Sequence, residues 1–221
     1  MILLMHIIPT YISLHYLCNK ANYNYNSTNM NIVQQKLLES AEVKRQIVDN
    51  HIIIEQVLSV ADNIIECFKA GGSVYFCGNG GSAADAQHLA AELSGRFYYD
   101  RQPLPSDALH CNTSFLTAVA NDYSFDEVYA RLINGIGLKG DILVGLSTSG
   151  NSKNIIKAFE QCRIKGIKTI AMTGQTGGLL HNIADTCICV PSTDTPRIQE
   201  SHITLGHIIC EIIESTLFPK K

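Results

Sequence analysis

The sequence has no excess of basic residues. Its 17 lysines and arginines stand against 20 acidic residues, which gives the chain a net charge of −3 at pH 7. Proteins that bind a phosphate backbone or an anionic membrane rely on basic surface charge. The composition therefore predicts neither nucleic acid nor a membrane as a partner.

The first 29 residues lack the features of a targeting or membrane segment. Lys20 is their only charged side chain, and two histidines and a proline interrupt the apolar run before it. A signal peptide needs a basic start and an unbroken apolar core, and a membrane-spanning helix needs about 20 apolar residues. We expect residues 1–29 to be a disordered or spurious extension, Met30 to be the functional start, and residues 30–221 to form a single domain.

The sequence also lacks the pattern of a domain held together by disulfides. Hydrophobic residues make up 46% of the chain and charged residues 17%, a balance that allows a core without cross-links. Several of the eight cysteines sit inside apolar runs and are typical of small buried hydrophobes in a reducing compartment, so we expect a cytoplasmic protein. In one strand-like run, Cys187 and Cys189 are expected to point to opposite faces and so to suit no metal ion.

Hydrophobic periodicity predicts two helices followed by five strands. Residues 31–70 have the three- and four-residue spacing of a helical hairpin, and its long apolar stripe predicts a homo-oligomer. Short β-rich runs then alternate with segments long enough for crossover helices; the runs are Val74–Cys77, Ala108–Cys111, Asp141–Leu146, Lys168–Met172 and Thr186–Val190. This alternation predicts an α/β fold with a parallel sheet whose carboxyl-terminal loops carry the chemistry.

The loop after the first predicted strand is rich in glycine. Gly78-Asn79-Gly80-Gly81-Ser82-Ala83 is a weak form of the dinucleotide fingerprint G-x-G-x-x-A. That fingerprint needs an acidic residue at the end of the second strand, which here ends at Cys111-Asn112 after too long a segment. A nicotinamide cofactor is therefore not expected. Either the loop brings its backbone close to a ligand, or it is a tight turn capped by Ser82.

The loop after the third predicted strand is rich in hydroxyl groups. Ser147, Thr148, Ser149 and Ser152 surround Gly150 at the start of a predicted helix. Hydroxyls, free backbone N–H groups and the helix dipole all favour an anion at such a place. The loop lacks the lysine of a triphosphate-binding loop, so a monophosphate ester is the expected ligand. The alternative is a polar capping turn without further function.

Two predicted helices carry candidate catalytic or metal-binding side chains. His88 and Glu92 lie four residues apart, so they project from one face of their helix. Gln199 and His207 share a broad face of the C-terminal helix. If the two helices face each other, the four side chains could form an acid/base pair or a metal site with nitrogen and oxygen ligands. Spacing alone does not choose between these uses.

Taken together, these motifs closely resemble the phosphoheptose isomerase family of the sugar isomerase (SIS) domain superfamily. The similarity runs from about Met30 to the C-terminus, with the motifs in the expected order. They are residues 77–88 (CGNGGSAADAQH), Glu92 with Gly95-Arg96-Phe97, Asn121-Asp122, residues 147–152 (STSGNS), and Arg197-Ile198-Gln199-Glu200 followed by His207.

The resemblance implies a five-stranded parallel sheet, an N-terminal helical hairpin and a homotetramer whose sites draw on neighbouring subunits. It implies interconversion of D-sedoheptulose 7-phosphate and D-glycero-D-manno-heptose 7-phosphate, the first step towards the ADP-heptose of surface polysaccharide. Glu92 would be the general base and His207 the general acid. Phosphate would bind to Ser82, Ser147, Thr148, Ser149 and Ser152, and the rest of the substrate to Asn79, Gly80, Gly81, Glu92, Asn121, Asp122 and Gln199.

Two further expectations come from relatives in the superfamily. Some family members carry zinc on the residues that match His88, Glu92, Gln199 and His207, so we expect one zinc ion per subunit that is not essential for turnover. A related replication initiator-associating protein is a non-catalytic scaffold with similar loops. It lacks the acid and the imidazole at the positions of Glu92 and His207, which favours an enzyme here.

Overall fold

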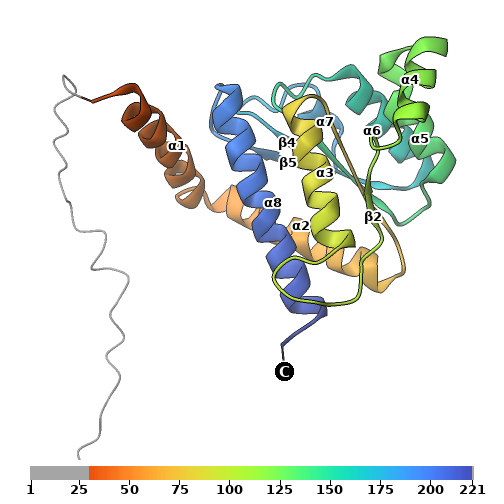
Figure 1. Ribbon diagram of the computed structural model, residues 1–221, viewed down its shortest axis with the longest axis horizontal. Helices are drawn as coiled ribbons and strands as arrows, with labels where there is room; N and C mark the ends of the chain where they lie inside the picture. The colour runs from red at the N-terminus through yellow and green to blue at the C-terminus, as the bar shows by residue number, and fades with distance from the viewer. Residues whose placement is uncertain (1–29, 221) are drawn as a thin grey trace, which may run out of the picture. The chain divides into compact units, whose positions relative to one another are not determined.

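The computed structural model describes residues 30–220 (Figure 1). The chain divides into two units between Lys36 and Leu37. The predicted extension, residues 1–29, lies outside the described residues. Between residues 30 and 220, no helix has both the length and the apolar character that crossing a bilayer requires.

Two helices precede the sheet, as the periodicity predicts. They are α1 (Ile32–Val48) and α2 (His51–Lys69). The side chain of Asn50 caps α2 by accepting hydrogen bonds from the first backbone N–H groups of that helix. α2 buries a full apolar face, whereas α1 buries only Val43 and Ile47.

Five parallel strands form one sheet, which confirms the predicted α/β fold. The order is β2-β1-β3-β4-β5, with β1 (Val74–Gly78), β2 (Ser106–Ala108), β3 (Ile142–Ser147), β4 (Lys168–Thr173) and β5 (Thr186–Cys189). Four of these strands match the predicted bounds closely. The bounds predicted for β2, Ala108–Cys111, were wrong, because its pairing with β1 ends at Ala108.

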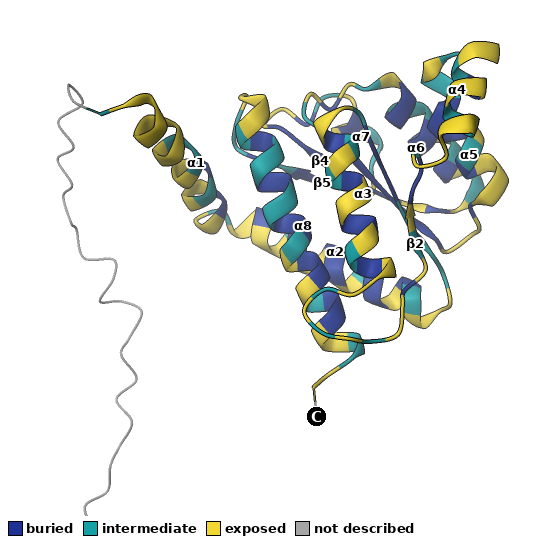
Figure 2. Ribbon diagram, in the orientation of Figure 1, coloured by how far each residue is buried: buried dark blue, intermediate teal, exposed yellow. Residues whose placement is uncertain are grey.

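Helices cover both faces of the sheet. α2, α3 (Gly81–Ser94) and α8 (Thr195–Leu217) enclose a core on one face that includes Phe76 and Met172. The elements on the other face are α4 (Thr113–Asp122), η2 (Phe125–Glu127), α5 (Val128–Ile136), α6 (Lys153–Lys165) and α7 (Leu180–Ile183). Figure 2 shows the strands as the buried layer between these helices.

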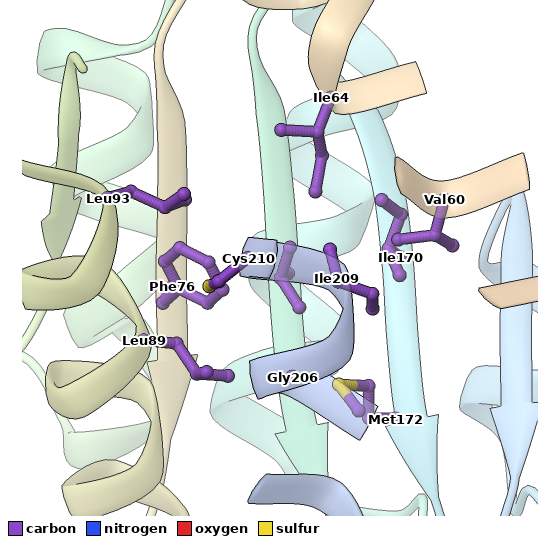
Figure 3. Close-up of a pocket in the computed structure, with 11 residues that line it drawn as sticks. Val60, Ile64, Phe76, Leu89, Leu93, Ile170, Met172, Gly206, Ile209 and Cys210 are labelled. Carbon is purple, nitrogen blue, oxygen red and sulfur yellow. The ribbon is translucent and has the colours of Figure 1, made fainter. Parts of the chain in front are cut away.

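A glycine lets α3 and α8 pack closely side by side. A Cβ atom on Gly206 of α8 would lie 2.5 Å from a methyl carbon of Leu89 on α3. Figure 3 shows both residues beside an apolar void of about 10 Å³. A void of this size without polar lining offers a water molecule no hydrogen-bond partner, so it belongs to the core. The close contact brings together the helix turns that carry His88 and His207.

The strand order places two candidate loops side by side. β1 and β3 are neighbours, and β2 and β4 flank them on opposite sides. At such a switch point the connections diverge and leave a crevice at the carboxyl ends of the strands. Gly78 pairs in register with Leu146. The glycine loop (residues 78–83) and the serine loop (residues 147–152) therefore start at neighbouring points.

One prediction about the cysteines was wrong. Cys187 and Cys189 lie two positions apart on β5, and residues at that spacing share a face of a strand. Their sulfur atoms are 3.7 Å apart. Within the described residues all cysteines are free. Burial raises the pKa of the Cys162 and Cys210 thiols to about 12, as expected for small buried hydrophobes.

Candidate active site

His88, Glu92 and His207 meet where α3 contacts α8. Oε1 of Glu92 lies 2.9 Å from Nε2 of His88, which in turn lies 3.3 Å from Nε2 of His207. The two imidazole rings stand edge to face, with centroids 4.9 Å apart. The side chains of His88 and Glu92 are 47% and 22% exposed, so a ligand can reach the group.

His88, Glu92 and His207 are placed so that they could serve either as metal ligands or as an acid/base pair, the two uses that sequence spacing left open. Their ligand atoms all lie within 4.8 Å of one another. Tetrahedral zinc with Zn–N bonds of about 2.0–2.1 Å separates two nitrogen ligands by about 3.3–3.4 Å, close to the separation of the two Nε2 atoms. A carboxylate and an imidazole within hydrogen-bond distance, such as Glu92 and His88, can also act as an acid/base pair.

The glycine loop approaches α8 closely. A Cβ atom on Gly81 would lie 2.6 Å from Nε2 of Gln199, so a side chain at position 81 would displace the amide of Gln199. The N-cap position of α3 is Gly80, with a φ of 57°, and it makes no side-chain capping bond. Ser82 is buried inside the first turn of α3 and is not the cap. These contacts favour a loop built for close approach over a turn capped by Ser82.

Long-range hydrogen bonds fix the glycine loop against the opposite layer. The side-chain amides of Asn79 and Asn154 exchange two hydrogen bonds, of 3.0 and 2.8 Å. The hydroxyl of Tyr129 donates to the carbonyl of Gly78. Sequence reasoning missed Asn154 and Tyr129, since neither belongs to a local motif that points to the loop.

Two hydroxyl groups of the serine loop face each other at the start of α6. The hydroxyls of Ser147 and Ser152 lie 2.8 Å apart, and Ser147 is buried. Ser152 occupies the N-cap position of α6 without making a capping bond, so its hydroxyl is directed into the loop. Ser149 is exposed and Thr148 is half-buried. Hydroxyl groups at a helix N-terminus in this arrangement can bind an anion.

A pocket of about 280 Å³ borders the serine loop. Thr148 and Ser149 form one side of it. The other lining residues come from the ends of β4 and β5 and the start of α8, and they are Gln175, Thr176, Ser192, Thr193, Thr195 and Ile198. Sequence reasoning did not assign these residues a role, although their density of hydroxyl groups was a usable signal.

Asn121 and Asp122 lie apart from this group, at the carboxyl end of α4. Both are exposed, and the amide of Asn121 donates to the carboxylate of Asp122 over 2.9 Å. Among residues 30–220, no hydrogen bond connects either side chain to the two loops or to His207. Their predicted contact with the substrate remains a proposal.

Known proteins resemble this chain in sequence. The sequence pattern of the SIS domain matches residues 37–174. The phosphoheptose isomerase of Aneurinibacillus thermoaerophilus is 47% identical over 189 residues, which cover 86% of this chain and 96% of the relative. The chain belongs to the phosphoheptose isomerase family.

Solved structures of phosphoheptose isomerases have the same fold. The structure from Neisseria gonorrhoeae matches with a TM-score of 0.78 and 40% identity, over 83% of this chain and 97% of that one. The structure from Francisella tularensis matches with a TM-score of 0.79 and 34% identity, over 83% and 96%. The resemblance read from the motifs is thereby confirmed.

Asp85 is a further charged residue close to the candidate active site of this phosphoheptose isomerase family member. It lies on α3, one turn before His88. Oδ2 of Asp85 is buried and has no hydrogen-bond partner among the described residues. Burial raises the pKa of the Asp85 carboxyl, and the nearby His88 and His207 act in the opposite direction. Sequence reasoning quoted this residue inside a motif without assigning it a role.

A buried ion pair supports the end of α3. The side chains of Arg101 and Glu214 are 2% and 1% exposed, with Nε of Arg101 3.1 Å from Oε1 of Glu214. Arg101 also donates to the backbone carbonyls of Glu92 and Leu93. Glu214 accepts from the backbone N–H of Phe97, whose ring lies 5.7 Å from that of His207. The pair therefore connects α3 and α8 beside the catalytic candidates.

Proposed function

We propose that the chain is an aldose–ketose isomerase that interconverts D-sedoheptulose 7-phosphate and D-glycero-D-manno-heptose 7-phosphate. The observation that carries the proposal is the meeting of Glu92, His88 and His207 between α3 and α8. Membership of the phosphoheptose isomerase family supports the same reaction. The acid and the imidazole that a non-catalytic scaffold would lack are both in place, which favours the enzyme.

The reaction moves a proton between C1 and C2 of the sugar through an enediol. Glu92 takes the proton from one carbon and returns it to the other, because a carboxylate can hold a proton between the two half-reactions. His207 delivers a proton to the carbonyl oxygen and removes one from the neighbouring hydroxyl. An imidazole suits this task because it titrates near neutrality. The isomerisation is redox-neutral overall and needs no nicotinamide cofactor.

The phosphate of the substrate is proposed to bind at the serine loop. A chain with a net charge of −3 binds an anionic ester through local donors, not through its overall field. The hydroxyls of Ser147 and Ser152 face each other at the N-terminus of α6 and supply such donors. Ser82, Thr148 and Ser149 are proposed to join them. Asn79, Gly80, Gly81, Asn121, Asp122 and Gln199 are proposed to contact the sugar.

Ser152→Ala is expected to weaken substrate binding. Losing a hydrogen bond to a charged group costs about 1.5–3 kcal/mol, so KM should rise about 10- to 100-fold while kcat changes little. Steady-state kinetics with sedoheptulose 7-phosphate measures both constants. Ser215→Ala, which removes an exposed hydroxyl from α8, is the matched control. A fall in kcat at unchanged KM would exclude a binding role for Ser152.

His88, Glu92, Gln199 and His207 are proposed to hold one zinc ion per subunit. The separations of the ligand atoms of His88, Glu92 and His207 fit such a site, and Gln199 is included from the family resemblance. Bound zinc supplies a Lewis acid that stabilises negative charge on the substrate oxygens. A ligated Glu92 or His207 is a poorer proton carrier, however, so the metal is proposed to be dispensable for turnover.

Removal of the metal is expected to leave turnover largely intact. The protein is treated with a chelator, its metal content is measured, and its activity and circular dichroism are compared with those of the untreated protein. Because the proposed proton transfers use side chains of the chain itself, the stripped protein should still isomerise the substrate. Loss of turnover at saturating substrate, with an unchanged fold, would show that the metal takes part in the chemistry.

The proposed subunit organisation is a homotetramer in the cytoplasm, with neither nucleic acid nor a membrane as a partner. Large apolar side chains of α1 and α2 are exposed in the single chain, among them Leu37, Leu38, Ile52 and Leu58. An apolar surface of this kind is typical of a subunit interface. Light scattering of the purified full chain measures the mass, and a monomer would contradict the proposal.

One experiment tests the reaction itself. Sedoheptulose 7-phosphate is incubated with the purified full chain in D₂O and followed by NMR. The expected result is a heptose 7-phosphate that carries solvent deuterium at C2, because Glu92 exchanges its proton with solvent. A folded protein that gives no aldose product would instead favour the scaffold.

A further inference from the structure

Three further metal-ligating side chains gather outside the proposed isomerase site. His181 comes from α7, and Cys187 and Cys189 come from the edge strand β5. Their ligand atoms all lie within 4.8 Å of one another. The Sγ atoms of the two cysteines are 3.7 Å apart, and Nδ1 of His181 is 3.7 Å from Sγ of Cys189. The proposed isomerase chemistry uses none of these groups.

These separations are those of a tetrahedral zinc site. With Zn–S bonds of about 2.3 Å and Zn–N bonds of about 2.0–2.1 Å, tetrahedral angles place two sulfur ligands about 3.8 Å apart and a sulfur and a nitrogen about 3.5–3.6 Å apart. The observed S···S and S···N separations are within about 0.2 Å of these values. The third separation, between His181 and Cys187, is at most 4.8 Å, so two of the three pairs already lie at the distance that one shared ion requires.

A disulfide explains the two cysteines less well. Alternate residues of an extended strand have Cα atoms about 6.6–6.8 Å apart, at the outer limit of the range for disulfides. Cys187 and Cys189 are both inside β5, where sheet pairing with β4 holds the backbone extended. Closing the bond would distort the edge strand, whereas binding a metal ion would not.

We propose that His181, Cys187 and Cys189 bind one zinc ion per chain, at a site separate from His88, Glu92 and His207. The hydroxyl of Thr173 lies 3.6 and 3.5 Å from the sulfur atoms of Cys187 and Cys189, so it can donate to a sulfur ligand and hold its orientation.

A pocket of about 390 Å³ lined by His181, Cys187 and residues of α2 gives the ion an entry path and leaves the fourth ligand position to water.

The ion has a structural role, because α7 supports the serine loop. The backbone N–H of Leu180 donates to the carbonyl of Gly150 over 3.0 Å. The backbone N–H of Leu179 donates to the side chain of Asn151 over 2.9 Å. α7 itself spans only Leu180–Ile183, too short to be stable alone. Zinc between His181 and β5 would fasten this helix to the sheet.

Cobalt(II) tests the site, because it replaces zinc and reports on its ligands. Thiolate ligands give Co²⁺ an intense near-ultraviolet charge-transfer band, which a site made only of histidine, glutamate and glutamine cannot give. The reduced full chain is titrated with Co²⁺ and then with Zn²⁺. In the unmodified chain the band should saturate within two equivalents, because the other proposed site also takes up Co²⁺. It should vanish when zinc is added and persist in His88→Ala.

Substitutions of the proposed ligands show which side chains bind the ion that gives the band. Cys189→Ser and His181→Gln change side chains that are not fully buried and should fold; each is expected to weaken zinc binding by at least about 100-fold, more than the loss of an outer-shell partner does. Cys111→Ser, which changes an exposed cysteine elsewhere, is the matched control. Absence of the band in the unmodified chain, or an undiminished band in Cys189→Ser, would overturn the proposal. The three side chains would then interact only through hydrogen bonds that involve the thiols. Failure of the isomerase proposal would leave this result unchanged.

Discussion

Replacing Glu92 with glutamine is expected to lower kcat by about 10²- to 10⁴-fold, the usual contribution of a general base. The amide has nearly the same shape as the carboxylate and can keep the contact with His88, but it cannot accept the proton from carbon. Because the serine loop is untouched, KM should change little. Steady-state kinetics and loss of deuterium exchange at C2 measure the effect.

The test separates the role of Glu92 as a base from its role as a metal ligand. Metal content is measured for Glu92→Gln and for the stripped unmodified chain. If the stripped chain remains active while Glu92→Gln is inactive, the loss belongs to the missing base. Glu66→Gln changes an exposed carboxylate on α2 that pairs with Lys69, and it should leave kcat unchanged. Activity of Glu92→Gln above a tenth of the original would refute the assignment.

Half of this site could be predicted from local sequence. His88 and Glu92 are four residues apart on one helix, and the i, i+4 geometry alone predicts their contact. The position of His207 could not be derived in this way, because it depends on how two helices distant in sequence pack. That packing rests on the absence of a side chain at Gly206, opposite Leu89. Recognition of the family motif supplied what local periodicity could not.

The fold followed from the sequence where the pattern was strong. Buried strands such as β3 and β4 read as continuous apolar runs, and their predicted bounds were close. β2 is an edge strand of three residues, from Ser106 to Ala108, and its first two residues are polar. Apolar residues follow β2 in the sequence, and for this reason the strand was predicted two to three residues too late in the chain. The prediction for Cys187 and Cys189 failed for a different reason. Side chains alternate between the two faces of a strand, so residues two positions apart share a face, and the prediction had placed them on opposite faces.

The buried pair of Arg101 and Glu214 was invisible to sequence reasoning, since the partners are 113 positions apart and belong to no motif. Arg101→Met is expected to destabilise the fold by about 3–5 kcal/mol, because it leaves the Glu214 carboxylate buried without its cation. For a chain of this size that corresponds to a fall in Tm of about 6–20 °C. Urea unfolding measures the free energy. Lys69→Met, which breaks the exposed pair with Glu66, is the control and should cost at most about 1 kcal/mol.

The pH dependence of this destabilisation separates charge from packing. Burial alone would raise the pKa of Glu214, but the backbone N–H groups of Phe97 and Tyr98 and the guanidinium of Arg101 outweigh it and lower the pKa. A carboxylate with a lowered pKa adds stability that is present above its unfolded pKa and is lost as the pH falls through the folded pKa. In Arg101→Met the guanidinium no longer opposes burial, while the two backbone N–H groups remain, so the pKa of Glu214 should rise and its protonation should relieve part of the cost. The difference in unfolding free energy between the two proteins should therefore shrink from pH 7 to pH 4, and an equal difference at both would assign the loss to packing of the guanidinium.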